Sequence, residues 1–323
     1  MPMREIIIGP NEADKRLDRF LTFYFKEASL GFIYKMLRKK NITLNGKKAD
    51  GTEKLKSSDV IKVFFSDETF EKLKGLNAAK TNEGKAYAKL GDIPVIYEDD
   101  YILLVNKPYG VLSQKAKPDD ISLNEWLIDY LLQKGSITKE SLSSYRPSIC
   151  NRLDRNTSGL VICAKALVGA RTMNELISKR HIDKYYRTIV YGHLSEPVSL
   201  KGYLTKDEKK NKVDIKVNDP GDGYSYIETE YVPIEYIKEK DLTVLEVKLV
   251  TGKPHQIRAH LSSIGHPIIG DIKYGGKKIG ALNHQLLHSY RVRFPEGLKE
   301  PFEALSGREF IAQLPKEFEK IKG

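Results

Sequence analysis

The most informative segment of the chain reads Asn151-Arg152-Leu153-Asp154-Arg155-Asn156-Thr157-Ser158-Gly159-Leu160. It sets one aspartate between two arginines, and the apolar run at 160–164 that follows predicts a buried strand. A carboxylate on the loop before such a strand is rigidly held and still reachable by a ligand, and flanking cations favour its ionised form. Taken alone, the segment also fits a structural aspartate–arginine pair at the start of a strand.

The segment resembles the signature of the RluA-type pseudouridine synthases, which usually reads His-Arg-Leu-Asp-x-x-Thr-Ser-Gly. Asp154 falls on the position of the family's catalytic aspartate. Asn151 stands where most members have histidine, so this chain departs from the pattern beside the aspartate but not at it.

Further segments match the same family in the same order. Residues 95–110 match its opening motif, and residues 184–192 match a strand in which Tyr186 aligns with the active-site tyrosine. Residues 251–261 read Thr-Gly-Lys-Pro-His-Gln-Ile-Arg-Ala-His-Leu, which places Arg258 on the family's arginine, with departures at Lys253 and Pro254. One such motif would be weak evidence, whereas their coincidence is specific.

The resemblance implies an α+β fold for residues 91–323, in which a mixed, largely antiparallel sheet carries a pseudouridine synthase active site in a cleft across it. The chain has neither a regular βαβ alternation nor a Walker loop. We expect Asn106 and Lys107 to line the rim of the cleft, His255 and Gln256 to brace their loop, and Tyr274 to pack.

The N-terminal part, residues 1–65, predicts a small separate domain. Apolar residues at helical spacing occur at 16–21 and 33–38, and alternating strands occur at 41–47 and 60–64, the first with an Asn-Gly turn. The unit resembles the alpha-L RNA-binding motif. Four cations near one helix end could contact RNA phosphates or could simply form a solvated helix face: Lys35, Arg38, Lys39 and Lys40. Residues 66–90 are rich in small and charged residues and predict a linker.

The composition supports a nucleic-acid partner. Lys and Arg number 54 against 43 Asp and Glu in 323 residues, giving a net charge of +11, and such a surface attracts polyanions. Cys150 and Cys163 are too few for a disulfide framework or a zinc site, and no segment has the apolar length of a membrane span. We expect a cytoplasmic, monomeric protein without metal or membrane association.

The reaction implied by the resemblance is the isomerisation of uridine to pseudouridine in RNA, with no cofactor. Asp154 would stabilise positive charge on the ribose, attack it, or remove a neighbouring proton, so a covalent ester and a glycal both remain open. Arg258 would pair with Asp154, or else contact an RNA phosphate. Tyr186 would stack on uracil, with core packing as its alternative. Arg152 would fill the space left by the extruded uridine, or form a salt bridge.

The domain arrangement looks most like the RluC-like branch, so we expect large-subunit ribosomal RNA as the target, with transfer RNA as the alternative. Two other functions fit parts of the sequence. A ribosome-assembly factor could bind RNA with the same fold without catalysis. A nucleoside N-glycosidase would let water capture the sugar, but glycosidases usually need a second carboxylate, which the signature lacks.

Overall fold

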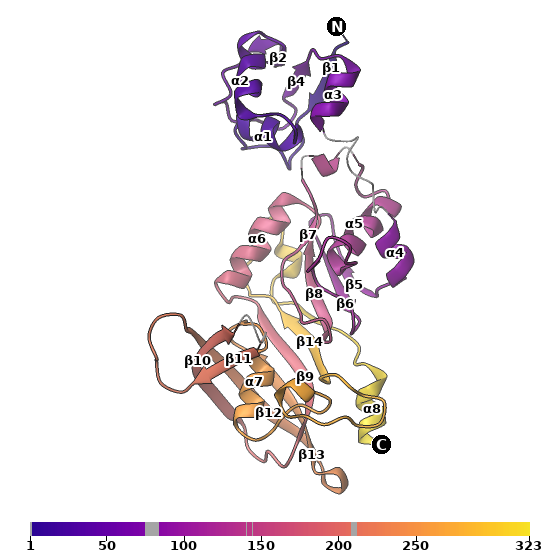
Figure 1. Cartoon of the computed structure of the whole chain (residues 1–323), viewed down its shortest axis with the longest axis vertical. Coiled ribbons are helices and arrows are strands. Elements are labelled where there is room, and N and C mark those ends of the chain that lie inside the picture. Colours follow the sequence, from indigo (N-terminus) through magenta and orange to yellow (C-terminus); the bar gives the residue numbers. More distant parts are fainter. Residues whose placement is uncertain (1, 75–83, 140, 144, 208–211) are drawn as a thin grey trace.

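The structure is a computed structural model that describes residues 2–74, 84–139, 141–143, 145–207 and 212–323. The described strands form two separate sheets, one near the N-terminus and one that organises the rest of the chain (Figure 1). Helices cover both sheets, so the fold is α+β with a mixed sheet, as the sequence predicted.

The N-terminal sheet is antiparallel, with the strand order β1-β4-β2-β3. Its elements are β1 (Arg4–Ile7), α1 (Leu17–Tyr24), α2 (Leu30–Arg38), β2 (Ile42–Leu44), β3 (Lys47–Lys48) and β4 (Val60–Val63). Asn45 and Gly46 both have positive φ, of 50° and 72°, which is the geometry that an Asn-Gly hairpin turn favours. The apolar faces of α1 and α2 pack on this sheet and form a core of their own.

The large sheet has the order β11-β10-β12-β13-β9-β14-β8-β6-β5, with β15 paired to β14 and β7 paired to β8. Of its described pairings, β14 with β8 is parallel and the others are antiparallel. Its strands are β5 (Val95–Glu98), β6 (Ile102–Lys107), β7 (Ser148–Ile149), β8 (Ser158–Ala164), β9 (Asp183–Tyr191), β10 (Val198–Asp207), β11 (Lys212–Lys216), β12 (Ser225–Ile237), β13 (Leu242–Leu249), β14 (Leu287–Arg293) and β15 (Glu309–Ile311).

Helices and short 3-10 turns connect these strands. The helices are α4 (Lys85–Leu90), α5 (Leu123–Gln133), α6 (Leu167–Ser178), α7 (Gln256–Ser263) and α8 (Lys316–Lys322). The 3-10 turns are Ser141–Ser143, Lys238–Lys240, Ile272–Tyr274 and Glu303–Leu305.

The middle of the large sheet is buried on both faces. Every residue of β8 is buried, which explains its continuous apolar run. On β6, Leu103 and Val105 pack with α5 and α7 on one face, whereas Ile102 and Leu104 pack with α6 on the other. The predicted hairpin at 95–108 is confirmed, and its second strand lies directly beside β8.

The segment predicted as a linker, residues 66–90, is helical at both ends. Its first end forms α3 (Asp67–Lys74), whose Phe70 packs in the N-terminal core, and its second end forms α4, whose Ala86 packs against α5. Residues 75–83 lie outside the described residues. We therefore propose that any linker is confined to the residues between α3 and α4.

Two composition-based expectations can be compared with the described residues. Cys163 is fully buried, Cys150 is half-buried among apolar side chains, and both are free thiols. None of the helices described is long and apolar enough to cross a membrane.

Candidate active site

Asp154 lies in the turn that leads into β8, and neighbouring groups hold this turn on both sides. The Leu153 amide donates to the Ser113 hydroxyl at 3.0 Å, and that hydroxyl donates to the Leu153 carbonyl at 2.7 Å. The Thr157 amide donates to the Asp154 carbonyl at 3.0 Å and closes the turn. The Asp154 side chain is 27% exposed, so a fixed backbone presents a carboxylate that a ligand can reach.

Gly159, at the start of β8, allows β14 to come close to this turn. Its φ is 110°, and a Cβ at this position would lie 2.2 Å from the Ser289 carbonyl oxygen on β14. Any larger residue would therefore push the two strands apart. Because β14 pairs with β8 on one side and β9 on the other, the glycine helps to bring Asp154 near the residues of β9.

Arg258 on α7 joins Asp154 to a second carboxylate. Its Nη1 donates to Asp154 Oδ2 at 2.9 Å, while its Nε and Nη2 donate to the two oxygens of Asp271 at 2.7 and 2.8 Å. The side chains of Arg258 and Asp271 are 8% and 1% exposed. Arginine is suited to this position because its planar fork matches a carboxylate in two parallel hydrogen bonds.

This pairing fixes both the charge and the direction of the guanidinium. Burial lowers the pKa of Arg258, but the hydrogen bonds and charges of Asp271 and Asp154 outweigh burial and raise it overall. With two donors committed to Asp271, the donor at Nη1 points at Asp154. Asp154 Oδ1 accepts no hydrogen bond from the described residues, so this oxygen is left for a ligand.

His255 and Tyr274 form a second contact to Asp154. The Tyr274 hydroxyl accepts from the Val213 amide at 3.2 Å and lies 2.8 Å from His255 Nδ1. A hydroxyl that donates to Nδ1 places the imidazole proton on Nε2. His255 Nε2 lies 3.8 Å from Asp154 Oδ2, and burial lowers the pKa of His255. In that tautomer a neutral imidazole turns its N–H towards the carboxylate.

Tyr186 lies on β9 and faces the same side of the sheet. It is 5% exposed, and burial raises its pKa to about 12, with the charge of Asp154 adding to the shift. The phenol is thus neutral at ordinary pH, and it is close enough to Asp154 for the charge of the carboxylate to affect its pKa. Little of its ring is open to a base in this conformation. Its neighbour Tyr185 lies on the other side of the strand. The Arg291 guanidinium carbon is 3.9 Å from the centre of the Tyr185 ring.

Comparison with known proteins identifies the family of the chain. The sequence model of the RNA pseudouridylate synthase family matches residues 101–263. An RNA pseudouridine synthase of Mycoplasma capricolum is 30% identical, over 96% of this chain and 97% of its own. The ribosomal large subunit pseudouridine synthase C of Rickettsia felis is 31% identical, over 87% and 88%. The chain belongs to the RNA pseudouridylate synthase family.

A solved structure shows the same fold. Human RNA pseudouridylate synthase domain containing 4 superposes with a TM-score of 0.55 at 19% identity, covering 72% of this chain and 92% of its own. The family match and the relatives show that the protein is an RNA pseudouridine synthase, an isomerase, as the sequence predicted.

Lys107 of this synthase does not lie at the rim of a cleft, where the sequence placed it. Its side chain is fully buried, and Nζ donates to the carbonyls of Pro108, Val111 and Arg155 at 3.1, 2.9 and 3.2 Å. Burial lowers the pKa of Lys107 to about 7, while the nearby charge of Asp154 opposes the shift. Three carbonyl acceptors suit three N–H donors, so these bonds act together with the charge of Asp154 against the effect of burial.

Asn151, which stands where the family usually has histidine, makes a structural contact to β8. Its side-chain oxygen accepts from the Ile162 amide on β8 at 2.7 Å. Arg152, the next residue, is exposed and forms no ion pair with the described residues. The salt-bridge alternative for Arg152 thus has no partner in the part of the chain that the structure describes.

The four cations proposed to bind RNA lie together in the N-terminal unit. Lys35 and Arg38 occupy the last turn of α2, Lys39 caps it and Lys40 follows with a φ of 56°. All four are exposed. A polyanion could therefore reach them, but the unit that carries them has a hydrophobic core separate from that beside the Asp154 turn.

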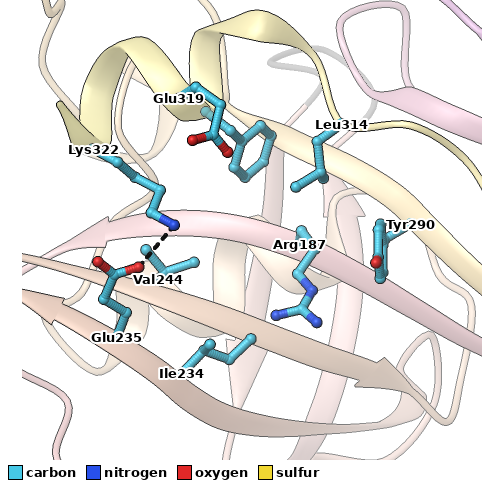
Figure 2. Close-up of a pocket in the computed structure, with 9 residues that line it drawn as sticks. Arg187, Ile234, Glu235, Val244, Tyr290, Leu314, Glu319 and Lys322 are labelled. Carbon is cyan, nitrogen blue, oxygen red and sulfur yellow. Dashed lines mark ion pairs between the residues drawn. The ribbon is translucent and has the colours of Figure 1, made fainter.

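A hollow of about 160 Å³ lies on the other face of the sheet (Figure 2). Arg187 lines it together with Tyr290 and the C-terminal helix α8. Because Arg187 and Tyr186 are neighbours on a strand, their side chains point to opposite faces. This hollow is therefore separate from the Asp154 turn. No group of three His, Cys, Asp or Glu residues in the described ranges could hold a metal ion.

Proposed function

We propose that this synthase converts specific uridines to pseudouridine in large-subunit ribosomal RNA, with Asp154 as the catalytic carboxylate and without a cofactor. The observation that carries the proposal is the Asp154–Arg258–Asp271 arrangement, in which one buried guanidinium orients a partly exposed carboxylate. The names of relatives from Rickettsia felis and Vibrio vulnificus, both ribosomal large subunit pseudouridine synthase C, support the choice of substrate.

The chemistry needs one well-aimed anion. The bond between ribose C1′ and uracil N1 breaks, the base turns, and C5 bonds to C1′. The C5 hydrogen leaves as a proton and N1 gains one, so the isomerisation consumes no oxidant, reductant or second substrate. Positive charge develops on the ribose as the first bond breaks, and a carboxylate held beside it lowers that barrier.

Asp154 is suited to this task because its two oxygens differ. Oδ2 accepts from Arg258 and faces His255, whereas Oδ1 remains open. The open oxygen could form an ester with C1′ or remove the C2′ proton to give a glycal, and both routes need an ionised carboxylate that is held in place. Arg258 would keep the carboxylate ionised and fixed throughout.

Tyr186 would contact the base. Because its pKa is raised to about 12, it would act as a neutral hydroxyl donor or acceptor near C5 and N1 rather than as a phenolate. With only 5% of the residue exposed, stacking on uracil would require neighbouring groups to open. Arg152, exposed beside the turn, would occupy the space that the extruded uridine leaves.

The N-terminal unit, residues 1–65, would act as an RNA-binding domain for the catalytic domain of residues 91–323. Its exposed Lys35, Arg38, Lys39 and Lys40 would contact phosphates without reading sequence. Affinity from such contacts falls as salt rises.

Pseudouridine mapping in cells lacking the gene tests this proposal. We expect signal to disappear at a few large-subunit ribosomal RNA uridines, to return with the wild-type gene, and to stay absent with Asp154→Asn. Asp100→Asn, at an exposed aspartate in the turn between β5 and β6, is the matched control and should restore the signal. Loss of a transfer-RNA site instead would change the substrate, and release of free uracil would indicate hydrolysis. Restoration by Asp154→Asn would contradict the catalytic assignment.

A further inference from the structure

An exposed aromatic pair lies beside the catalytic turn and has no role in the chemistry above. The ring of Tyr109 stacks on that of His284, with centroids 4.4 Å apart and planes inclined by 18°. Tyr109 is 50% exposed, and His284 is half-buried. A large ring left half in solvent and supported from behind by a second ring is a surface suited to a further flat group.

Both members of the pair are tied to the turn that contains Asp154. Tyr109 lies between Pro108 and Val111, whose carbonyls accept from Lys107 Nζ, and the same Nζ also binds the carbonyl of Arg155. Lys107 is fully buried, so this link is rigid.

A second connection to the turn runs through the residue that follows His284. Gln285 follows His284 and is buried, and its side-chain amide donates to the Thr157 hydroxyl at 3.3 Å. Hydrogen bonds therefore connect the segments that carry the two rings to Arg155 and Thr157, which lie on the same short turn as Asp154. Their position relative to the catalytic carboxylate is fixed by the fold.

The surroundings favour a nucleotide over an apolar ligand. Tyr109 borders an open hollow of about 290 Å³, whose wall also includes Asn106 and Lys316. Lys316 and Arg155 are exposed cations, and the whole chain carries a net charge of +11. A nucleotide supplies both a flat base for the ring and a phosphate for the cations.

We propose that the Tyr109–His284 pair is a stacking platform for an unpaired base of the RNA substrate that neighbours the target uridine. This inference rests on the proposed function, since it takes RNA as the ligand. Bases in RNA loops are commonly recognised by stacking on aromatic side chains. The platform would hold a flanking base while Asp154 acts on the extruded uridine, so it would contribute to substrate binding and not to the chemical step.

The chain provides a matched control. Tyr236 and His193 form a second stacked pair, with centroids 3.9 Å apart and planes inclined by 22°, and Tyr236 is 36% exposed. This pair lies near the turn between β12 and β13, where the Tyr236 hydroxyl donates to Asp241. It thus has the same chemistry as the platform without any tie to the catalytic turn.

The test measures turnover of an unmodified large-subunit ribosomal RNA transcript carrying tritium at uridine C5. Stacking of a base on an aromatic side chain changes affinity roughly fivefold to 100-fold when the ring is removed. We therefore expect Tyr109→Ala to raise KM about tenfold, with kcat within about twofold of wild type. Tyr109→Phe keeps the ring and should behave like wild type, as should Tyr236→Ala.

A direct readout avoids dependence on catalysis. The native chain has one tryptophan, Trp126, which is buried. In Tyr109→Trp the transcript should quench the new fluorescence, and in Tyr236→Trp it should not. An unchanged KM in Tyr109→Ala, an equal loss in Tyr236→Ala, or a loss confined to kcat would overturn the platform. If wild type shows no turnover while Tyr109→Trp is still quenched, the platform stands and the proposed function fails.

Discussion

Asp271 accepts two hydrogen bonds from Arg258, at 2.7 and 2.8 Å, and its side chain is 1% exposed. The bidentate pair leaves Nη1 of Arg258 to aim at Asp154. The direction of the proposed catalytic carboxylate would therefore depend on an aspartate that is itself buried.

Asp271→Asn should lower kcat strongly and leave KM nearly unchanged. The asparagine keeps the volume but removes one acceptor and the charge, so Arg258 can turn away from Asp154. Misplacing a reacting group by about 1 Å can cost about 100-fold in rate, and we expect a loss of about 10- to 100-fold. Single-turnover assays check this, with thermal unfolding as a control, because loss of a buried charge partner also costs about 3–5 kcal/mol. A kcat equal to that of wild type would show that Asp271 does not position Arg258.

Tyr274→Phe should allow the proton of His255 to move between its two ring nitrogens. Without the hydroxyl, nothing in the described structure holds the proton on Nε2, and the contact to Asp154 weakens. A net hydrogen bond is worth about 1 kcal/mol, which predicts a loss of about fivefold in kcat. The ring-nitrogen NMR shifts of ¹⁵N-labelled histidine report the tautomer directly.

Tyr231→Phe is the control for this change, because its buried hydroxyl has no hydrogen bond to His255 or Asp154 among the described residues. It should leave both rate and tautomer unaltered. If Tyr274→Phe shows the wild-type nitrogen shifts, His255 is fixed by other contacts.

Sequence patterns predicted the elements of this fold well where a short pattern of residues is compatible with one local structure. The apolar run at 160–164 became the fully buried β8, and Asn45-Gly46 became a tight turn with positive φ at both residues. These elements depend on residues that are close together in the chain, so they can be predicted from the sequence. The family resemblance implied a mixed, largely antiparallel sheet, but the order in which distant strands pair came only from the structure.

The candidate site was harder to predict because its supporting contacts are long-range. Lys107 looks like a surface lysine beside a proline, yet the fold buries it among three carbonyls. Asp271 sits in a glycine-flanked turn, and only tertiary structure shows that it lies opposite Arg258. The sequence does place Asp271 soon after Arg258, but this closeness does not show towards which carboxylate the guanidinium points.

Lys107→Met should change how stability depends on pH. Burial lowers the pKa of Lys107 to about 7 in the folded protein, against about 10.4 in an unfolded chain. Between these values the unfolded chain binds more protons, so the wild-type free energy of unfolding should rise with pH relative to the variant. The slope is at most about 1.4 kcal/mol per pH unit. Urea unfolding at pH 7, 8 and 9 measures it, and the exposed Lys89→Met should show no such trend. Parallel curves for wild type and Lys107→Met would mean that Lys107 keeps its proton throughout.

Removing two charges from the end of α2 should weaken RNA binding without affecting the chemical step. Lys39 and Lys40 are exposed at the end of α2 in the N-terminal unit, whose hydrophobic core is separate from that beside the Asp154 turn. Each lost phosphate contact should reduce the slope of log affinity against log salt by about 1. We therefore expect Lys39→Gln/Lys40→Gln to bind the ribosomal RNA transcript several-fold more weakly at low salt, with a slope smaller by up to about 2. Lys238→Gln/Lys320→Gln removes the same charge from exposed positions elsewhere, and should alter the slope far less. Equal effects of the two double variants would mean that net charge alone attracts the RNA, and that α2 makes no specific phosphate contact.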